Sequence, residues 1–178
     1  MIIIVAGTNG SGKTTLMRRL IDALGEPKSQ NKMVLEWDRT VIVGKYDGPN
    51  CGGCDGFSWK GAADDIEQLV VQHHERGQDV LLEGVIVSTW GMERLKRLAQ
   101  KGLVVVHLTT PVEVCEASVN ERRKVRMGEK YTPVKPDNLV SKHQGLEKGV
   151  EKRRAEGIDV RRFDREAAFA EIRGMLGV

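Results

Sequence analysis

The feature that most constrains the fold is the segment 7–14, GTNGSGKT, near the amino end of the chain. It matches the pattern G-x-x-x-x-G-K-[ST] at every fixed position, between an apolar run at 2–6 and a helical pattern at 13–24. Because glycine makes up about 7% of average proteins, a chance match arises in about one sequence in a hundred of this length. The strand–loop–helix context therefore predicts a phosphate-binding loop in an α/β domain.

The residue types in this segment suit an anion. Glycines allow backbone conformations that turn successive amide hydrogens inward, and the helix that begins near Lys13 adds its positive end. Lys13 is expected to reach the β- and γ-phosphates of a nucleotide, and the Thr14 hydroxyl is expected to bind Mg²⁺. The alternative is a glycine-rich turn without a ligand. The predicted nucleotide-binding residues are Gly7, Thr8, Asn9, Gly10, Ser11, Gly12, Lys13, Thr14 and Thr15.

Short apolar segments rich in β-branched residues alternate with segments of helical periodicity along the rest of the chain. Because parallel strands need long crossover connections, this alternation predicts a five-stranded parallel sheet covered by helices on both faces, which is a three-layer α/β fold. The length of 178 residues fits one domain, 1–178. The predicted strands are 2–6, 33–37, 79–82, 103–108 and 158–163.

The composition is that of a globular protein. It is 40% hydrophobic and 30% charged. No apolar run reaches the roughly 20 residues that span a bilayer, and the amino end has neither the basic region nor the cleavage site of a secretory leader. We therefore expect a soluble, cytoplasmic protein with no membrane partner.

The three cysteines, Cys51, Cys54 and Cys115, are too few for a disulfide scaffold and indicate a reducing compartment. Cys51 and Cys54 have the C-x-x-C spacing of a zinc knuckle. However, no second C-x-x-C and no H-x₃₋₅-H supplies the other ligands of a four-coordinate zinc site. We interpret the glycine-rich segment 51–56 as a loop that approaches a substrate closely, and metal binding by the two cysteines stays open.

Two carboxylates are expected at the carboxyl ends of strands, where ligands collect in open α/β sheets. Asp38 follows the second predicted strand and can accept or orient the proton of a hydroxyl acceptor, the alternative being a turn residue beside Arg39. Asp47 and Asp55 are the next candidates for that role. Glu83 follows the third predicted strand and can hold Mg²⁺ through water, the alternative being a structural ion pair.

Positive charge is concentrated late in the chain. Residues 120–165 contain 14 Lys and Arg against 8 Asp and Glu, a net charge of +6 in a chain of +3. A polyanionic ligand and a solvated basic face both fit this pattern. Arg122 and Arg126 share a helix face, whereas Arg123 points elsewhere. Since guanidinium groups suit phosphate oxygens, we expect 120–136 to form a lid that brings Arg122 and Arg126 to the nucleotide.

The loop 7–14, Asp38, Glu83 and the segment 122–126 resemble the P-loop kinases, which include nucleoside monophosphate kinases, gluconate kinase and the kinase half of polynucleotide kinase. The resemblance spans nearly the whole chain and implies a nucleotide-kinase-like P-loop NTPase fold with ATP and Mg²⁺. A GTPase is disfavoured because the segment 31–34, NKMV, lacks the Asp of the guanine motif. The catalytic residues that the resemblance implies are Lys13, Asp38, Arg122 and Arg126.

Three further segments, 43–47, 51–56 and 82–88, look like a phage subgroup of these kinases that phosphorylates 5-hydroxymethyluracil within DNA. This resemblance implies a hydroxyl group on a DNA base as acceptor, duplex DNA as partner and the host cytoplasm as location. If the base is extruded, aromatic side chains can stack on it. The expected acceptor-binding residues are Asp38, Lys45, Tyr46, Asp55 and Trp59.

Two other functions stay open. The first is a kinase for a free nucleotide or a small metabolite, in which the basic segment serves only as a nucleotide lid. The second is a nucleotide-dependent binding module without phosphoryl transfer. The oligomeric state is not predicted by any sequence feature.

Overall fold

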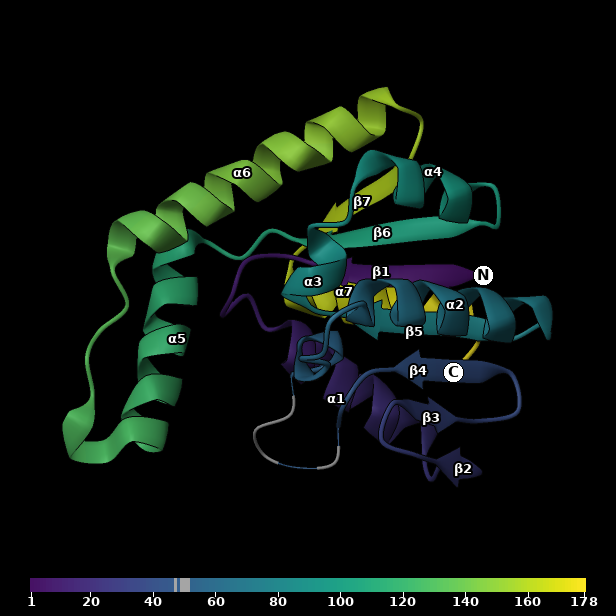
Figure 1. Ribbon diagram of the computed structural model, residues 1–178, viewed down its shortest axis with the longest axis horizontal. Coiled ribbons are helices and arrows are strands. Elements are labelled where there is room, and N and C mark those ends of the chain that lie inside the picture. The colour runs from purple at the N-terminus through teal and green to yellow at the C-terminus, as the bar shows by residue number, and fades with distance from the viewer. Residues whose placement is uncertain (47, 49–51) are drawn as a thin grey trace.

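The computed structural model describes residues 1–46, 48 and 52–178. Its helices lie on both sides of a sheet that has β1 in its interior (Figure 1). In chain order the elements are β1 (Ile2–Ala6), α1 (Lys13–Leu24), β2 (Ser29–Gln30), β3 (Val34–Glu36), β4 (Thr40–Val43), η1 (Cys54–Gly56), α2 (Ala62–Glu75), β5 (Asp79–Glu83), α3 (Val85–Ser88), α4 (Met92–Ala99), β6 (Leu103–Leu108), α5 (Val112–Met127), η2 (Gly128–Lys130), α6 (Pro136–Ala155), β7 (Asp159–Phe163) and α7 (Arg165–Leu176).

The described residues form one seven-stranded mixed sheet in the order β2-β3-β4-β5-β1-β6-β7. Five neighbouring strands, from β4 to β7 in that order, run parallel. Strand β3 runs antiparallel to β4, and β2 runs antiparallel to β3. The prediction of a five-stranded parallel sheet is therefore wrong in the number of strands and in the direction of the second predicted strand.

The error comes from the segment 33–43. Residues 37–39 form a short connection between β3 and β4, and the backbone N–H of Trp37 donates to the Thr40 carbonyl at 2.8 Å. So short a connection joins antiparallel neighbours, because parallel strands need a crossover of about a dozen residues or more. The parallel neighbour of β5 on the side away from β1 is β4, a β-branched run to which the sequence analysis assigns no strand.

Two hydrophobic cores cover the two faces of the sheet, because successive side chains of a strand point in opposite directions. On β1, Ile3 and Val5 pack in the cluster of α1 and α7, whereas Ile2 and Ile4 pack in the cluster of α2, α3, α4 and α6. This arrangement gives the three α/β layers. None of the helices in the described part of the chain is both long enough and apolar enough to cross a membrane.

Helices α5 and α6 form an arm, residues 112–155; in Figure 1, α5 stands apart from the sheet on the left, beyond the carboxyl ends of the parallel strands, and α6 runs from there across the top. Of the residues of α5, Cys115 alone is buried. The Asn120 side chain accepts a 2.8 Å hydrogen bond from the Val134 backbone N–H and so ties the connection 131–135 to α5. The predicted lid, 120–136, contains the outer half of α5, η2 and this connection, and its closure stays a prediction.

Candidate active site

The loop between β1 and α1, residues 7–14, lies at the centre of the candidate site and is called the phosphate loop below. Gly10 and Gly12 have φ angles of 86° and 91°, which few residues other than glycine adopt. A Cβ atom at Gly10 would lie 2.2 Å from the carbonyl oxygen of Cys115, at the base of the arm. Glycine at position 10 is therefore required both by the turn of the loop and by the contact with α5.

The Lys13 side chain folds back over this loop. It is 6% exposed, and its Nζ donates to the carbonyl oxygens of Gly7 at 2.9 Å and Thr8 at 3.1 Å. Burial lowers the pKa of Lys13, while the charges of Glu83 and Asp55 raise it. The ammonium group is thus fixed beside the loop amides, where a phosphate chain would lie.

Glu83 ends β5 next to the phosphate loop. The Thr14 hydroxyl, at the start of α1, donates to Glu83 Oε1 at 2.8 Å. Burial raises the pKa of Glu83, and the Lys13 charge and the Thr14 hydrogen bond lower it. A hydroxyl and a carboxylate side by side are oxygen ligands of the kind that Mg²⁺ takes, so these residues fit the metal that the fold implies.

The glycine-rich segment after β4 brings Asp55 to the same edge. Gly53 packs so closely against Glu83 that a Cβ there would lie 2.4 Å from Oε1. The exposed Asp55 carboxylate accepts backbone hydrogen bonds from Val85 at 2.8 Å and Ile86 at 2.9 Å. Its position at the start of α3 therefore sets a second carboxylate next to Glu83 and within electrostatic reach of Lys13.

Arg122 is the arginine of the arm whose charge reaches Lys13 and Glu83. Burial is the largest cause of both pKa shifts: it lowers the pKa of Lys13 and raises that of Glu83. The Arg122 charge lowers both pKa values. Arg126 lies one helical turn farther along the exposed part of α5. Arg123 instead donates to the Thr132 carbonyl at 3.2 Å, within the arm.

Asp38 is not part of this cluster. Because β3 is antiparallel, its carboxyl end lies at the edge where the parallel strands begin, and the Asp79 N–H at the start of β5 donates to the carbonyl of the adjacent Arg39 at 2.7 Å. The Asp38 side chain is 73% exposed and forms an ion pair with Lys28. The expectation that Asp38 follows a parallel strand is corrected: the turn places it at the opposite edge from the phosphate loop.

Comparison with known proteins identifies the family. The model of the family described as 5-hmdU DNA kinase matches residues 1–150. The chain belongs to this family. It is similar to the 5-hmdU DNA kinase of Pseudomonas phage PaMx11, with 35% identity over 98% of this chain and 96% of that one. It is also similar to the 5-hmdU DNA kinase of Pseudomonas phage M6, with 32% identity over 97% and 95% of the two chains.

Solved structures of other kinases share the fold of this 5-hmdU DNA kinase family member. A gluconokinase from Sinorhizobium meliloti 1021 matches with a TM-score of 0.51 at 15% identity, covering 98% of this chain and 94% of that one. Shikimate kinase from Acinetobacter baumannii in complex with shikimate matches with a TM-score of 0.50 at 20% identity, covering 99% and 93%. With the family assignment, the shared fold identifies a P-loop kinase.

The remaining residues predicted to bind the acceptor of this family member fall on two faces of the sheet. Trp59 is 43% exposed, and its ring lies 5.1 Å from that of Phe57, in the core cluster of α2 and α3. The Lys45 N–H donates to the Gly53 carbonyl at 2.9 Å, which holds Lys45 beside the segment that carries Asp55. These residues are therefore on the side of Asp55.

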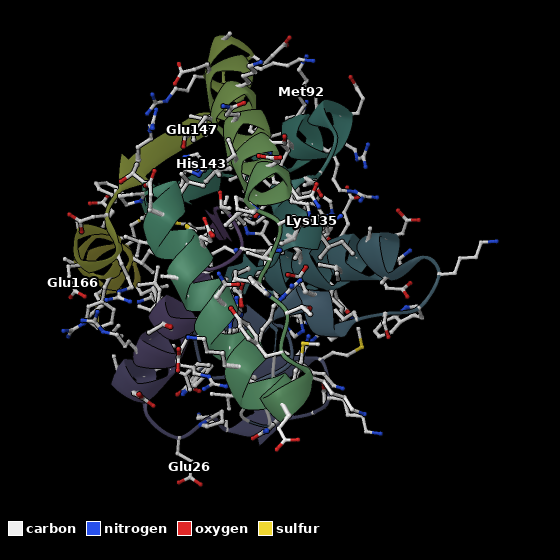
Figure 2. All side chains as sticks on the ribbon, turned by 90° about the vertical axis from the view of Figure 1, so that its left-hand side faces the viewer. Glu26, Met92, Lys135, His143, Glu147 and Glu166 are labelled. Atoms are coloured by element: carbon white, nitrogen blue, oxygen red, sulfur yellow. The ribbon has the colours of Figure 1, made fainter. Side chains whose placement is uncertain are left out.

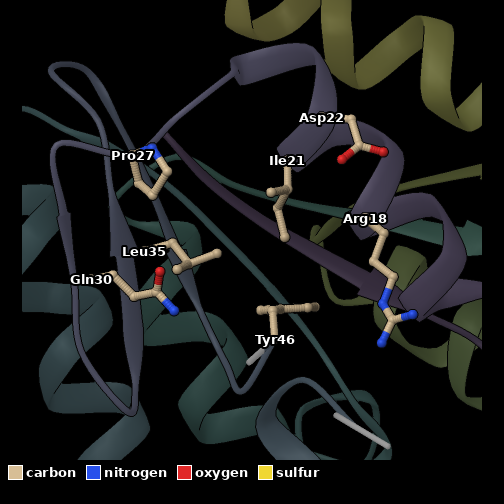
Figure 3. Close-up of a pocket in the computed structure, with 7 residues that line it drawn as sticks. All are labelled: Arg18, Ile21, Asp22, Pro27, Gln30, Leu35 and Tyr46. Carbon is tan, nitrogen blue, oxygen red and sulfur yellow. The ribbon is translucent and has the colours of Figure 1, made fainter. Parts of the chain in front are cut away.

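Tyr46 packs on the other face, with the cluster of α1 and α7. Its ring still lies near the segment that carries Asp55, since a Cβ atom at Gly44 would be 2.9 Å from both Tyr46 Cε2 and the Gly53 backbone. Figure 3 shows it on the wall of a pocket of about 300 Å³ between α1 and the β2–β3 edge of the sheet. The residues that line this pocket are Arg18, Ile21, Asp22, Pro27, Gln30, Leu35 and Tyr46.

The two cysteines of the C-x-x-C segment are described only in part. Cys51 lies outside the described residues. The Cys54 thiol is buried and donates to the Val43 carbonyl at 3.3 Å, and burial raises its pKa well above the usual value. Cys54 thus serves as a small core residue that attaches the segment to β4.

One contact of the phosphate loop involves a residue that the sequence analysis did not single out. His143 of α6 lies with its Nδ1 2.9 Å from the Thr8 hydroxyl, 135 residues away in the chain. The only sequence signal is the spacing of His143 and Glu147 on one helix face, which is common in ordinary helices.

Proposed function

We propose that this kinase transfers the γ-phosphoryl group of ATP to the hydroxymethyl group of 5-hydroxymethyluracil in phage DNA, in the cytoplasm of the host. The observation that carries the proposal is the convergence of Lys13, Thr14, Glu83 and Asp55 at one sheet edge, in a chain that matches the 5-hmdU DNA kinase family over residues 1–150. Phosphoryl transfer depends mainly on positioning and electrostatic stabilisation. This cluster offers both.

The phosphate loop and Lys13 would hold the triphosphate. The loop amides and the amino end of α1 bind phosphate oxygens, and the Lys13 ammonium neutralises charge on the β- and γ-phosphates. Thr14, and Glu83 through water, would hold Mg²⁺, which supplies further positive charge to the transferred group. Arg122, whose charge acts on Lys13 and Glu83, is the arginine that we assign to the phosphoryl group.

Asp55, rather than Asp38, would orient the acceptor hydroxyl. Its carboxylate is exposed, and the backbone amides of Val85 and Ile86 fix both oxygens at 2.8 and 2.9 Å. A carboxylate in a fixed place next to the phosphate loop can align a hydroxyl group and accept its proton. Lys45 and Trp59 lie on the same side and would contact the base or its strand.

The arm would contact the DNA backbone. The lid segment 120–136 carries six basic and two acidic side chains, and all of them except the half-buried Arg123 are exposed. Because duplex DNA is a dense line of phosphates, such a segment binds it mainly by releasing counterions. The basic residues are Arg122, Arg123, Lys124, Arg126, Lys130 and Lys135.

The acceptor is tested by incubating γ-labelled ATP and Mg²⁺ with four separate acceptors: duplex DNA containing 5-hydroxymethyluracil, the same duplex with thymine, a free nucleotide mixture and the free nucleoside of 5-hydroxymethyluracil. Label in the modified duplex and not in the thymine duplex is expected. Label in free nucleotides alone would contradict the proposal and favour a nucleotide kinase. ATP binding without transfer to any acceptor would favour a binding module.

The backbone contact is tested by salt dependence. Replacing Lys124 and Lys130 together by Ala is expected to weaken binding of modified and unmodified duplexes alike, and to reduce the slope of log affinity against log salt by about 2. The matched control replaces two exposed cations outside the arm, Lys32 and Arg76, by Ala. Fluorescence anisotropy of a labelled duplex measures both variants. An unchanged slope in the arm variant would place the DNA elsewhere.

A further inference from the structure

The second residue of the phosphate loop is bound by the arm. Thr8 is 3% exposed, and its hydroxyl lies 2.9 Å from Nδ1 of His143 on α6. Its carbonyl oxygen accepts a hydrogen bond from Lys13 Nζ at 3.1 Å. One loop residue therefore contacts both the lysine that we assign to the phosphates and the helix that completes the arm.

On the carboxyl-terminal side of His143, side chains fix α6 to the body of the protein. Glu147, one helical turn on, lies 2.8 Å from Nε2 of His107 on β6 and 2.6 Å from a terminal nitrogen of Arg162 on β7. Arg153, farther along, donates to the Ser88 carbonyl and is itself buried. Figure 2 views the molecule from the side of the arm and labels His143 and Glu147, which follow one another along α6. His143 thus lies where the anchored carboxyl-terminal half of α6 meets its amino-terminal half, which is joined to α5 through residues 128–135.

Helix α5 is fixed to the phosphate loop near its amino end. There Cys115 lies against Gly10, and the Thr110 hydroxyl just before α5 donates to the Ser11 carbonyl at 2.9 Å. Arg122 is seven residues beyond Cys115, roughly 10 Å along the helix axis. A change of about 5° in the tilt of α5 at this base would therefore move Arg122 by about 1 Å, and a misplacement of that size is enough to change a reaction rate strongly.

The tilt of α5 depends on α6. The two helices pack against each other, and Asn120 of α5 holds Val134 in the connection between them at 2.8 Å. A contact that fixes the amino-terminal half of α6 relative to the phosphate loop therefore fixes α5 as well.

We propose that His143 is a positioning residue: through its contact with the Thr8 hydroxyl it sets the angle of the arm to the phosphate loop, and thereby the place of Arg122 at the transferred phosphoryl group. This inference rests on the proposed phosphoryl transfer. It assigns to α6 a role in catalysis that involves no contact with a substrate.

The test measures kcat, KM for ATP and the melting temperature of His143→Ala. We expect kcat to fall about tenfold and KM for ATP to change less than threefold, because the loop amides and Lys13 still bind the nucleotide. His143→Asn keeps a hydrogen-bonding group near the place of Nδ1 and should recover most of the rate. Thr8→Val should match His143→Ala, and Thr8→Ser, which keeps the hydroxyl, should lose less of kcat than Thr8→Val.

A double-mutant cycle separates positioning from general stability. If His143 acts through Arg122, adding His143→Ala to Arg122→Ala should lower kcat by less than twofold further. Losses that multiply would overturn the inference, as would an unchanged kcat in His143→Ala. Failure of the parent enzyme to label modified DNA is a different result: it refutes the proposed acceptor, and the cycle is then measured with the acceptor that the parent enzyme does label.

Discussion

A Lys13→Ala variant is expected to lose at least about a hundredfold in kcat/KM with every acceptor, because removing one fixed charge from a preorganised phosphate site has an effect of that order. The lysine is buried, and both of its hydrogen bonds go to the phosphate loop. Residues 7–14 contain no other cationic side chain that could take its place. Steady-state transfer of labelled phosphate, with ATP and acceptor each varied, measures the loss.

Two further variants show whether the charge is responsible. Lys13→Met keeps the length of the side chain without its charge and should be as inactive as Lys13→Ala, with a melting temperature near that of the parent. Lys28→Ala removes an exposed lysine, paired with Asp38, and should keep activity within twofold. Full activity in both Lys13 variants would mean that the loop does not bind the triphosphate.

The second large effect is expected for Asp55→Asn, with a fall in kcat of about a hundredfold and little change in the affinity for nucleotide. Asparagine cannot act as a base, and its amide nitrogen cannot accept one of the two backbone hydrogen bonds from Val85 and Ile86. General base catalysis alone commonly contributes two to four orders of magnitude. Single-turnover transfer to duplex DNA containing 5-hydroxymethyluracil measures the chemical step, and binding of a fluorescent nucleotide checks that the loop is intact.

Asp38→Asn is the matched control for this prediction. It makes the same chemical change in a carboxylate that is 73% exposed at the opposite edge of the sheet, so its activity should stay within twofold of the parent. A large loss in Asp38→Asn together with an active Asp55→Asn would reverse the assignment and place the acceptor at that edge.

The contrast between these carboxylates shows what the sequence could and could not predict. The phosphate loop and its lysine were found because the chemistry is contained in eight consecutive residues, 7–14, with a recognisable context. The placement of Glu83 followed from a local fact as well, since it is the last residue of a buried strand beside the loop. Its role toward a metal remains a proposal.

The position of Asp38 depended on strand direction, which hydrophobic periodicity does not contain. A strand at 33–37 gives the same pattern of apolar residues whether it runs parallel or antiparallel to its neighbour. The usable signal was the β-branched run 40–43, which only three residues separate from the end of β3. So short a connection excludes a parallel crossover. Recognising that run as a strand would have removed Asp38 from the edge of the phosphate loop and left Asp47 and Asp55 as the candidates.

The contact between Thr8 and His143 could not have been predicted, because it joins residues 135 positions apart and depends on how the arm lies over the sheet. The packing of Tyr46 with the cluster of α1 and α7, opposite the cluster that contains Phe57, is of the same kind.

The sparse burial of α5 has a consequence for how such enzymes diverge. With Cys115 as its one buried residue, folding constrains few of the other positions of the helix, so substitutions there alter the electrostatic surface with little effect on thermodynamic stability. Members of this family could thus diverge in the outward charges of this helix while the phosphate loop at its base stays the same.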